Sequence, residues 1–286
     1  MNGRVSISKQ FPKYFFKLEN REPKSETFLQ EKIIFMTIQE FFSIYSHIHV
    51  CHYNENFMYN HITMRHVPQV YSIAKFSTHV NSDCFFELTQ IDHRFYRGDP
   101  KYQYSISRFL IFKIIDGQPY YIGGNISTSK YNTLKMNITE GNYYVVGVLD
   151  WKGDVYDFNF SAYSEGDVYF ERVHYNENPD IISQLFKPYI EDKTAARTPS
   201  RNKDFLKYEK TIDELQLRVE LFVNNSNSKT LNLKKKISKM ENASLLNIVP
   251  NEKNDIETQA FPQSSKLILV GSSQFSKPFV YVYEDK

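Results

Sequence analysis

Apolar and polar residues alternate along much of the chain with the two-residue period of β-strands, most clearly in the stretch 142–174. Within it, Phe158 and Phe160 alternate with Asp157 and Asn159, which predicts a strand with one buried and one exposed face. Short breaks rich in Asp and Gly divide the stretch into three apolar runs. We therefore expect an antiparallel meander whose apolar face is covered by a second sheet.

The same pattern continues toward the N-terminus as far as residue 69. Strands follow one another at a spacing of roughly ten residues, with turn signals such as Asp116-Gly117 between them and no helical pattern in between. This arrangement predicts an antiparallel β-sandwich of eight strands rather than a parallel sheet. The expected strands are 69–77, 84–92, 104–115, 119–124, 131–138, 142–149, 155–163 and 168–174.

A second β-like block follows residue 210 and fits a small sandwich-like module. Its expected strands are 215–223, 230–237, 245–249, 256–261, 266–270 and 279–283. Between the two blocks, residues 191–204 are polar and basic without an apolar period, which is typical of a linker. One short helix is expected before them, at 181–189.

The N-terminal part has a different character. A charged stretch predicts an arm, and Thr37 with Glu40 forms a capping box that begins a short helix at 38–45. A strand is expected at 47–53. The predicted organisation comprises five segments: 1–35 an N-terminal arm, 36–67 a helix plus a strand, 68–174 the sandwich, 175–210 a linker and 211–286 the second β module.

Composition supports the β prediction and narrows the class of protein. Aromatic residues make up 16% of the 286 residues, including 21 Tyr and 23 Phe, and such residues favour pleated, half-buried surfaces. The formal net charge of +2 is too small to indicate nucleic-acid or membrane binding. Two cysteines and no apolar run near the ~20 residues of a membrane span indicate a cytoplasmic protein.

Candidate catalytic and zinc-binding residues are few. His47, His49 and Cys51 would share one face of a strand, but zinc needs three or four ligands and no second cluster completes the set. Neither Cys51 nor Cys84 begins a helix, so we expect buried structural thiols rather than nucleophiles. The sequence predicts no catalytic residue.

Five aspartates in predicted loops are the only calcium candidates: Asp92, Asp99, Asp150, Asp154 and Asp157. Carboxylates on loops at one end of a β-sandwich can bind calcium through oxygen. Aspartate is also the ordinary residue of turns that end strands, and this interpretation is favoured because no loop has a dense carboxylate set. No other cofactor is expected.

Three stretches carry motifs of a known family. Residues 36–53 contain a short helix followed by a strand ending in Cys51, the segment 86–94 contains an "L-x-Q-x-D-x-R" pattern, and 140–165 contains a glycine-tyrosine pair followed by an "F-x-φ-x-φ-x-S-E" strand. The motif residues are Cys51, Leu88, Gln90, Asp92, Arg94, Gly141, Tyr143, Phe158, Phe160, Ser164 and Glu165.

In order and spacing these stretches resemble the calpain family, from the end of its protease core through its C2-like (domain III type) sandwich. The resemblance implies that 36–67 is a remnant of the protease core. The family's catalytic Cys, His and Asn lie upstream of the matched helix, and none of their motifs occurs here. The family's acidic loop is also missing, since Val67–Asp83 contains one carboxylate.

The favoured hypothesis is a non-catalytic calpain-like scaffold or interaction protein, a structural subunit of a larger cytoplasmic or ciliary assembly. Its partners would be other proteins, bound through strand edges, aromatic faces and the segments 1–30 and 175–210. No small-molecule substrate is expected. The ciliary or cytoskeletal location rests on a composition typical of AT-rich genomes, and on the expansion of divergent calpain-like families in single-celled eukaryotes, several of them ciliated. The alternatives are a C2-type calcium- or phospholipid-binding module and, third, a calpain-like cysteine peptidase.

Overall fold

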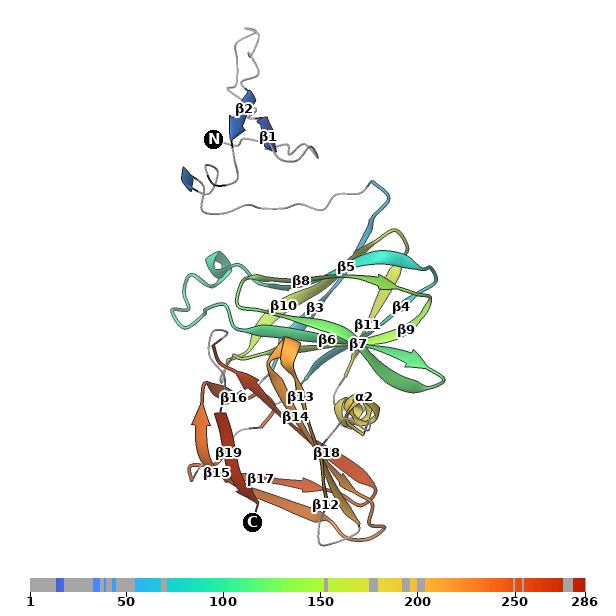
Figure 1. Ribbon diagram of the computed structural model, residues 1–286, viewed down its shortest axis with the longest axis vertical. Coiled ribbons are helices and arrows are strands. Elements are labelled where there is room, and N and C mark those ends of the chain that lie inside the picture. The colour runs from blue at the N-terminus through green and yellow to red at the C-terminus, as the bar shows by residue number, and fades with distance from the viewer. Residues whose placement is uncertain are drawn as a thin grey trace. The chain divides into compact units, whose positions relative to one another are not determined.

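The structure is a computed structural model whose chain divides into two compact units, 1–54 and 55–286 (Figure 1). It describes residues 55–67, 71–151, 154–174, 180–191, 204–248, 250–253, 255–274 and 280–283, residues 39, 43 and 44, and the backbone of 14–17, 33–36, 196–199 and 284–285.

In the first unit, β1 (Tyr14–Lys17) pairs antiparallel with β2 (Ile33–Met36). Both strands fall where the sequence predicted an arm or the start of the next segment. Residues 39, 43 and 44 are helical, within the helix expected at 38–45. The Thr37–Glu40 capping box and the strand expected at 47–53, with Cys51, lie outside the described residues.

The second unit begins with an antiparallel sandwich, which we call the first sandwich. Its strands are β3 (Met58–His66), β4 (Ser72–Thr78), β5 (Ser82–Gln90), β6 (Ser107–Ile115), β7 (Gln118–Ser127), β8 (Tyr131–Ile138), β9 (Gly141–Leu149), β10 (Tyr156–Ser164) and β11 (Val168–Val173). They form a four-stranded sheet, β3-β10-β5-β8, and a five-stranded sheet, β11-β4-β9-β6-β7. The mainly-β sandwich prediction is confirmed, with β3 as a ninth strand outside the predicted range.

The meander predicted for 142–174 is wrong. Of its three strands, β9 and β11 lie in the five-stranded sheet with β4 between them, while β10 lies in the opposite sheet between β3 and β5. The chain therefore crosses from one sheet to the other between β9 and β10, and crosses back between β10 and β11. Alternation along a strand specifies which face is buried, but it does not specify which strand is the neighbour.

The core of the first sandwich is almost entirely aromatic and aliphatic. The rings of Phe76 and Tyr143 stack with 4.7 Å between centroids, and Phe86 lies 5.9 Å from Phe160 across the four-stranded sheet. Both phenyl rings of the latter pair are fully buried. The density of Phe and Tyr noted in the sequence therefore fills the space between the two sheets.

The second sandwich has eight strands. They are β12 (Ala196–Pro199), β13 (Phe205–Ile212), β14 (Leu217–Asn224), β15 (Leu231–Glu241), β16 (Ala243–Leu245), β17 (Asp255–Ala260), β18 (Ser264–Ser272) and β19 (Val280–Asp285). One sheet has the order β12-β13-β14-β18-β16 and the other the order β17-β15-β19. Each of the six strands expected here overlaps an observed strand, and β12 and β13 lie in the range predicted as a linker.

An apolar layer joins the two sandwiches. The helix α2 (Ile181–Ile190) packs between the five-stranded sheet of the first sandwich and the β13-β14-β18 sheet of the second, as Figure 1 shows. Its Phe186 lies 5.2 Å from Phe112 of β6 between ring centroids. We call this cluster the bridging layer. Its buried members are Ile73, Leu110, Phe112, Val146, Val148, Ile181, Ile182, Leu185, Phe186, Ile190, Ile212, Leu215, Leu217, Val219, Leu221, Val223, Leu267 and Leu269.

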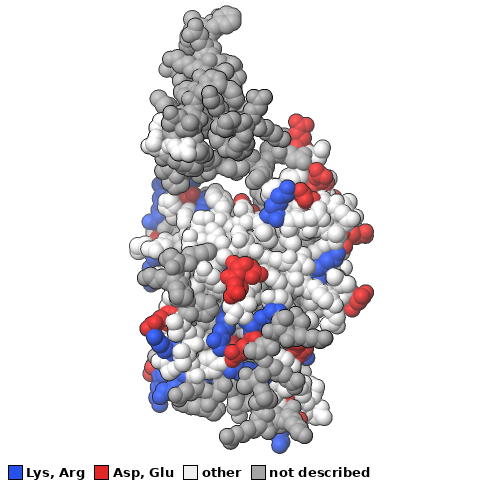
Figure 2. Space-filling model, viewed as in Figure 1, with Lys and Arg blue, Asp and Glu red and all other residues white. Residues whose placement is uncertain are grey.

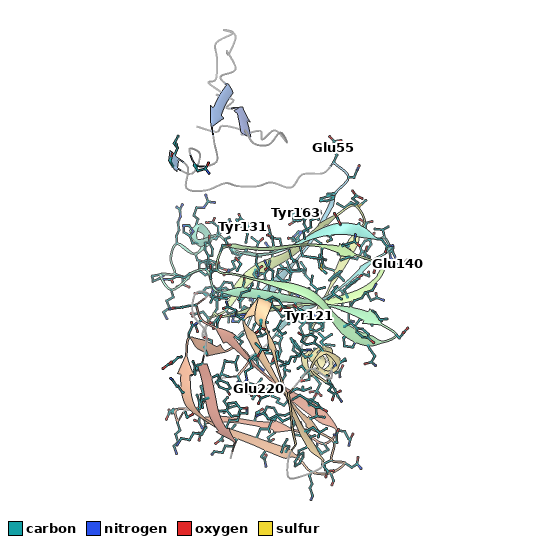
Figure 3. All side chains as sticks on the ribbon, viewed as in Figure 1. Glu55, Tyr121, Tyr131, Glu140, Tyr163 and Glu220 are labelled. Carbon is teal, nitrogen blue, oxygen red and sulfur yellow. The ribbon has the colours of Figure 1, made fainter. Side chains whose placement is uncertain are left out.

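The range 175–210 is therefore not a simple linker, because its described part contains α2 and the start of β13. The helix was expected at 181–189, and its apolar residues at positions 181, 182, 185 and 186 form one face. That face is buried on the sheets instead of being free to bind a partner. Tyr121 of β7 reaches Tyr189 of the same helix, with 5.0 Å between ring centroids (Figure 3).

One buried cation also crosses this boundary. Arg108 of β6 is completely buried, and its Nε donates to Leu215 O at 2.9 Å while one Nη donates to Ser272 O at 2.7 Å. Burial lowers the pKa of Arg108 to about 10. A Cβ on Gly271 would lie 2.8 Å from Leu246 Cδ1 and 2.9 Å from the guanidinium carbon of Arg108, so a larger residue here would have to displace these side chains.

Candidate functional site

The predicted calcium ligands do not form one cluster. Asp92 caps the short 3-10 helix η1 (His93–Tyr96) and accepts from the Arg94 Nε at 2.9 Å and the Lys130 Nζ at 3.2 Å. Hydrogen bonds from the Arg94 side chain and backbone, with a further one from Lys130, hold its pKa well below the usual range. Its charge is already neutralised by protein cations, which a calcium ion would have to displace.

The other four aspartates are held separately. Asp99 accepts a hydrogen bond from Tyr156 Oη at 2.7 Å, and Asp157 pairs with Arg65 at 2.8 Å; each interaction lowers the pKa of the carboxyl group. Asp150 and Asp154 are half-buried next to β9 and β10. Across the part of the chain that the structure describes, no three His, Cys, Asp or Glu side chains could hold a metal ion together.

The described cysteine is placed as a structural thiol. Cys84 of β5 is completely buried, and burial raises the pKa of its thiol to about 12. The thiolate that a cysteine peptidase needs is therefore disfavoured at neutral pH. Burial also lowers the pKa of His66, whose Nε2 lies 3.0 Å from Trp151 O and must donate the proton in that bond.

The family-motif residues inside the described ranges fix loops and pack the core. Gln90 is completely buried at the end of β5. Its Nε2 donates to Ser105 O at 2.8 Å and Ser129 O at 3.2 Å, and its Oε1 accepts from Ser105 N at 2.8 Å. One amide thus joins the loops that precede β6 and β8, which explains a glutamine at this position.

The remaining motif residues have comparable structural roles. Leu88, Phe158 and Phe160 lie in the core, and the Tyr143 hydroxyl donates to Thr139 O. Gly141 has a φ of 148°, which favours glycine at the start of β9. Ser164 bonds the carbonyl of Gly166 and Glu165 lies in the exposed turn beside it.

An ionic cluster lies inside the second sandwich. Lys235 of β15 and Glu220 of β14 are 1% and 0% exposed, and their charged atoms are 2.5 Å apart. Arg218 joins Glu220, at 3.0 Å, to Glu209, at 2.8 Å. Figure 3 labels Glu220 between the two sheets.

The hydroxyl of Tyr283 completes this cluster. It donates to Glu209 at 2.5 Å, and its ring lies 3.3 Å from the Lys235 Nζ, over the ring face. Lys207 also contacts Glu209, at 2.7 Å. Glu209 and Glu220 therefore each contact two basic side chains. These pairs neutralise the carboxylate charges and connect the strands that carry them.

Sequence reasoning missed this cluster and one surface feature. Lys207 and Glu209 were assigned to a linker, although their alternation with Leu206 and Tyr208 is a strand signal. The surface feature is Phe95, the most exposed of the large apolar residues that the structure describes, at 81%. Its position in a polar turn between two strands was the available signal.

The face of the molecule seen in Figure 2 has mixed charge. In the view of Figure 2, Lys and Arg alternate with Asp and Glu among uncharged side chains, and neither sign covers a face. The helices described in the structure include none with the length and hydropathy required to traverse a membrane. Tyr131 and Tyr163 lie on the outer face of the four-stranded sheet (Figure 3).

Comparison with known proteins adds no assignment. Neither a family model nor a curated protein matches this chain. The resemblance to the calpain family stays a prediction that rests on the sequence motifs alone.

Proposed function

We propose that this chain is a non-catalytic scaffold protein, of the calpain-like kind that its motifs resemble, which holds binding surfaces at a fixed spacing in a larger cytoplasmic or ciliary assembly. The observation that carries the proposal is the bridging layer. It buries apolar residues of both sandwiches and of α2 in one continuous cluster, whereas domains that move relative to each other meet through smaller, more polar contacts.

The chemistry of the described side chains agrees with a binding role. Cys84 is held as a thiol, Asp92 is neutralised by cations, and the buried Glu220 of the second sandwich is engaged by Lys235 and Arg218. These groups stabilise loops and strands. Partner proteins would bind the exposed surface, where apolar side chains such as Phe95 and Tyr59 are accessible to solvent.

The proposal is tested by isolating the tagged full chain from cells under gentle conditions and identifying the proteins that co-purify in stoichiometric amounts. We expect at least one stable partner. A chain that is recovered alone, and that also remains a monomer in analytical ultracentrifugation when purified, contradicts a scaffold role.

Calcium calorimetry on the same purified chain, with and without anionic vesicles, tests the alternative function. The scaffold proposal expects no heat of binding at millimolar calcium. Saturable binding that is lost in an Asp92→Asn variant would favour a C2-type module instead.

A further inference from the structure

The loop between β5 and β6, residues 91–106, displays an apolar side chain that the fold of this chain does not use. We call it the Phe95 loop; in Figure 1 it is the teal loop with a short helical turn that projects from the left of the first sandwich. Phe95 is 81% exposed. An exposed phenylalanine side chain forgoes the favourable free energy that its burial would contribute.

The backbone of this loop is held in place from both ends. Asp92 Oδ1 accepts from Arg94 N at 3.0 Å, Asp92 O accepts from Phe95 N at 2.9 Å, and Tyr96 O accepts from Asp99 N at 2.8 Å. These bonds hold the backbone at Phe95 in place before any partner binds, which reduces the entropy lost on binding.

Aromatic packing fixes the loop from beneath. The ring of Tyr96 lies 4.3 Å from Tyr102 and 5.2 Å from Tyr156 between centroids, and Tyr102 Oη donates to Ile91 O at 2.5 Å. Trp151 lies on the other side of Tyr102, at 6.0 Å. Among the phenyl and phenol rings of this loop, Tyr96 and Tyr102 pack inward, whereas Phe95 points its ring into water.

The charges around Phe95 are asymmetric. Arg94 is 66% exposed, and Arg97 and Lys101 are also exposed. The two carboxylates of the loop face inward: Asp92 is 14% exposed and bound by cations, and Asp99 accepts from the Tyr156 hydroxyl. The Arg94 guanidinium pairs with Asp92, and the other exposed charged side chains of the loop, Arg97 and Lys101, are both basic.

From this arrangement we infer that the Phe95 loop is a docking site for a partner protein that offers an apolar pocket rimmed by Asp or Glu side chains. The phenyl ring fills the pocket as an anchor, and Arg97 and Lys101 meet the carboxylates around it. Preorganised aromatic anchors beside arginine are typical of the residues that contribute most to protein–protein affinity. The inference rests on the proposed scaffold function and names the surface through which it acts.

Phe261 offers a matched control. It is 63% exposed and lies in the second sandwich, just after β17, so Phe261→Ala removes the same side chain from a different loop of the molecule. Neither Phe95→Ala nor Phe261→Ala removes core packing, and both variants should unfold at the wild-type temperature.

The experiment compares quantitative captures by wild-type, Phe95→Ala, Arg97→Glu/Lys101→Glu and Phe261→Ala full-length chains, from the same cell extract at low and high salt. We expect one stoichiometric partner to be lost from the Phe95→Ala and double-charge captures and at high salt, and to be retained by Phe261→Ala. With that partner purified, Phe95→Ala should weaken the Kd by roughly 30-fold or more. A photo-crosslinker at position 95 should attach to a partner segment rich in Asp or Glu.

Three results would overturn the inference. Equal capture of every partner by wild-type and Phe95→Ala chains removes the docking site but leaves the scaffold function standing, whereas the absence of partners from all captures removes both. Sedimentation of the wild-type chain with phosphatidylserine-containing vesicles, lost in Phe95→Ala, would assign the loop to a lipid surface instead.

Discussion

The two sandwiches differ in the side chains that fill the space between their sheets. The first fills the space between its sheets with aromatic rings such as Phe86, Phe109 and Phe160, all completely buried. The second has an apolar half and an ionic half, in which Glu220 and Lys235 are as buried as those rings. An apolar core remains folded when part of one side chain is removed. Removing one member of a buried ionic cluster leaves its partner's charge uncompensated, which costs more stability.

The strongest test of this contrast is removal of one buried charge. Glu220→Gln removes the carboxylate that Lys235 contacts at 2.5 Å, while Arg218 keeps its pair with Glu209. We expect the free energy of unfolding to fall by roughly 3–5 kcal/mol. Urea unfolding measures the change. The exposed pair Lys239–Glu241, 3.2 Å apart, provides the control, since Glu241→Gln should cost less than about 1 kcal/mol. Equal costs at the two sites would refute the ionic-core account.

A second substitution distinguishes charge from packing. Combining Glu220→Leu with Lys235→Met removes both members of the buried pair and replaces them with apolar side chains. We expect the double variant to recover most of the stability lost in Glu220→Gln, because a well-packed apolar pair can replace a buried ion pair at little cost. A double variant that is less stable than Glu220→Gln would show that the pair is net stabilising.

In the bridging layer, Leu221→Ala should lower stability by roughly 2–5 kcal/mol, since it opens a cavity in fully buried apolar surroundings. The loss of stability should also be detected in the other sandwich. Although Leu221 belongs to the second sandwich, the fluorescence of Trp151, the only tryptophan of the chain and part of the first sandwich core, should report the same loss. A Trp151 transition unchanged by Leu221→Ala would mean that the two sandwiches unfold independently.

Arg108 should contribute less than the apolar layer around it. Arg108→Met keeps the aliphatic stem but leaves the Leu215 and Ser272 carbonyls without their donor, which should cost roughly 1–3 kcal/mol. Arg65→Met, at a side chain 64% exposed, is the control and should be near neutral. If Arg108→Met left the free energy of unfolding unchanged, the apolar contacts alone would stabilise the junction between the two sandwiches.

The smallest effect depends on pH. Burial acts to raise the pKa of Glu209, but hydrogen bonds from Lys207 and Tyr283 together with the charge of Arg218 outweigh it and lower the pKa overall. A lowered folded pKa gives stability that is present above the unfolded pKa and lost as pH falls through the folded value. The stability difference between wild type and Glu209→Gln should therefore shrink on acidification. A difference that grows at acid pH would contradict this sign.

Much of the fold could be predicted from the sequence, because period-2 alternation and Asp-Gly turns are local signals. The hairpin turn at Asp116-Gly117 has positive φ at both residues, as its sequence indicates. Which strands pair with each other depends on segments far apart in the sequence, so local patterns did not specify the pairing and the predicted meander was wrong. β3 was missed because its outer positions, including Thr63 and Arg65, are polar and exposed, so its apolar count is low.

The candidate site was harder to predict for the same reason. Charged residues at strand positions, as at Glu220 and Lys235, look like solvated faces until the opposite strand is known. Phe95 could have been noticed as an apolar residue in a basic turn. Its exposure, however, depends on Tyr96 and Tyr102 packing inward, which no local pattern specifies.

The most direct test of a single rigid unit is the coincidence of two unfolding probes in the full chain. Trp151 fluorescence follows the first sandwich, and pulsed hydrogen exchange of the segment Leu217–Asn224 follows the second. The bridging layer predicts the same urea midpoint for both probes. If the β14 amides lost protection at a urea concentration where Trp151 was still native, the two sandwiches would be separate domains and the fixed-spacing scaffold would be contradicted.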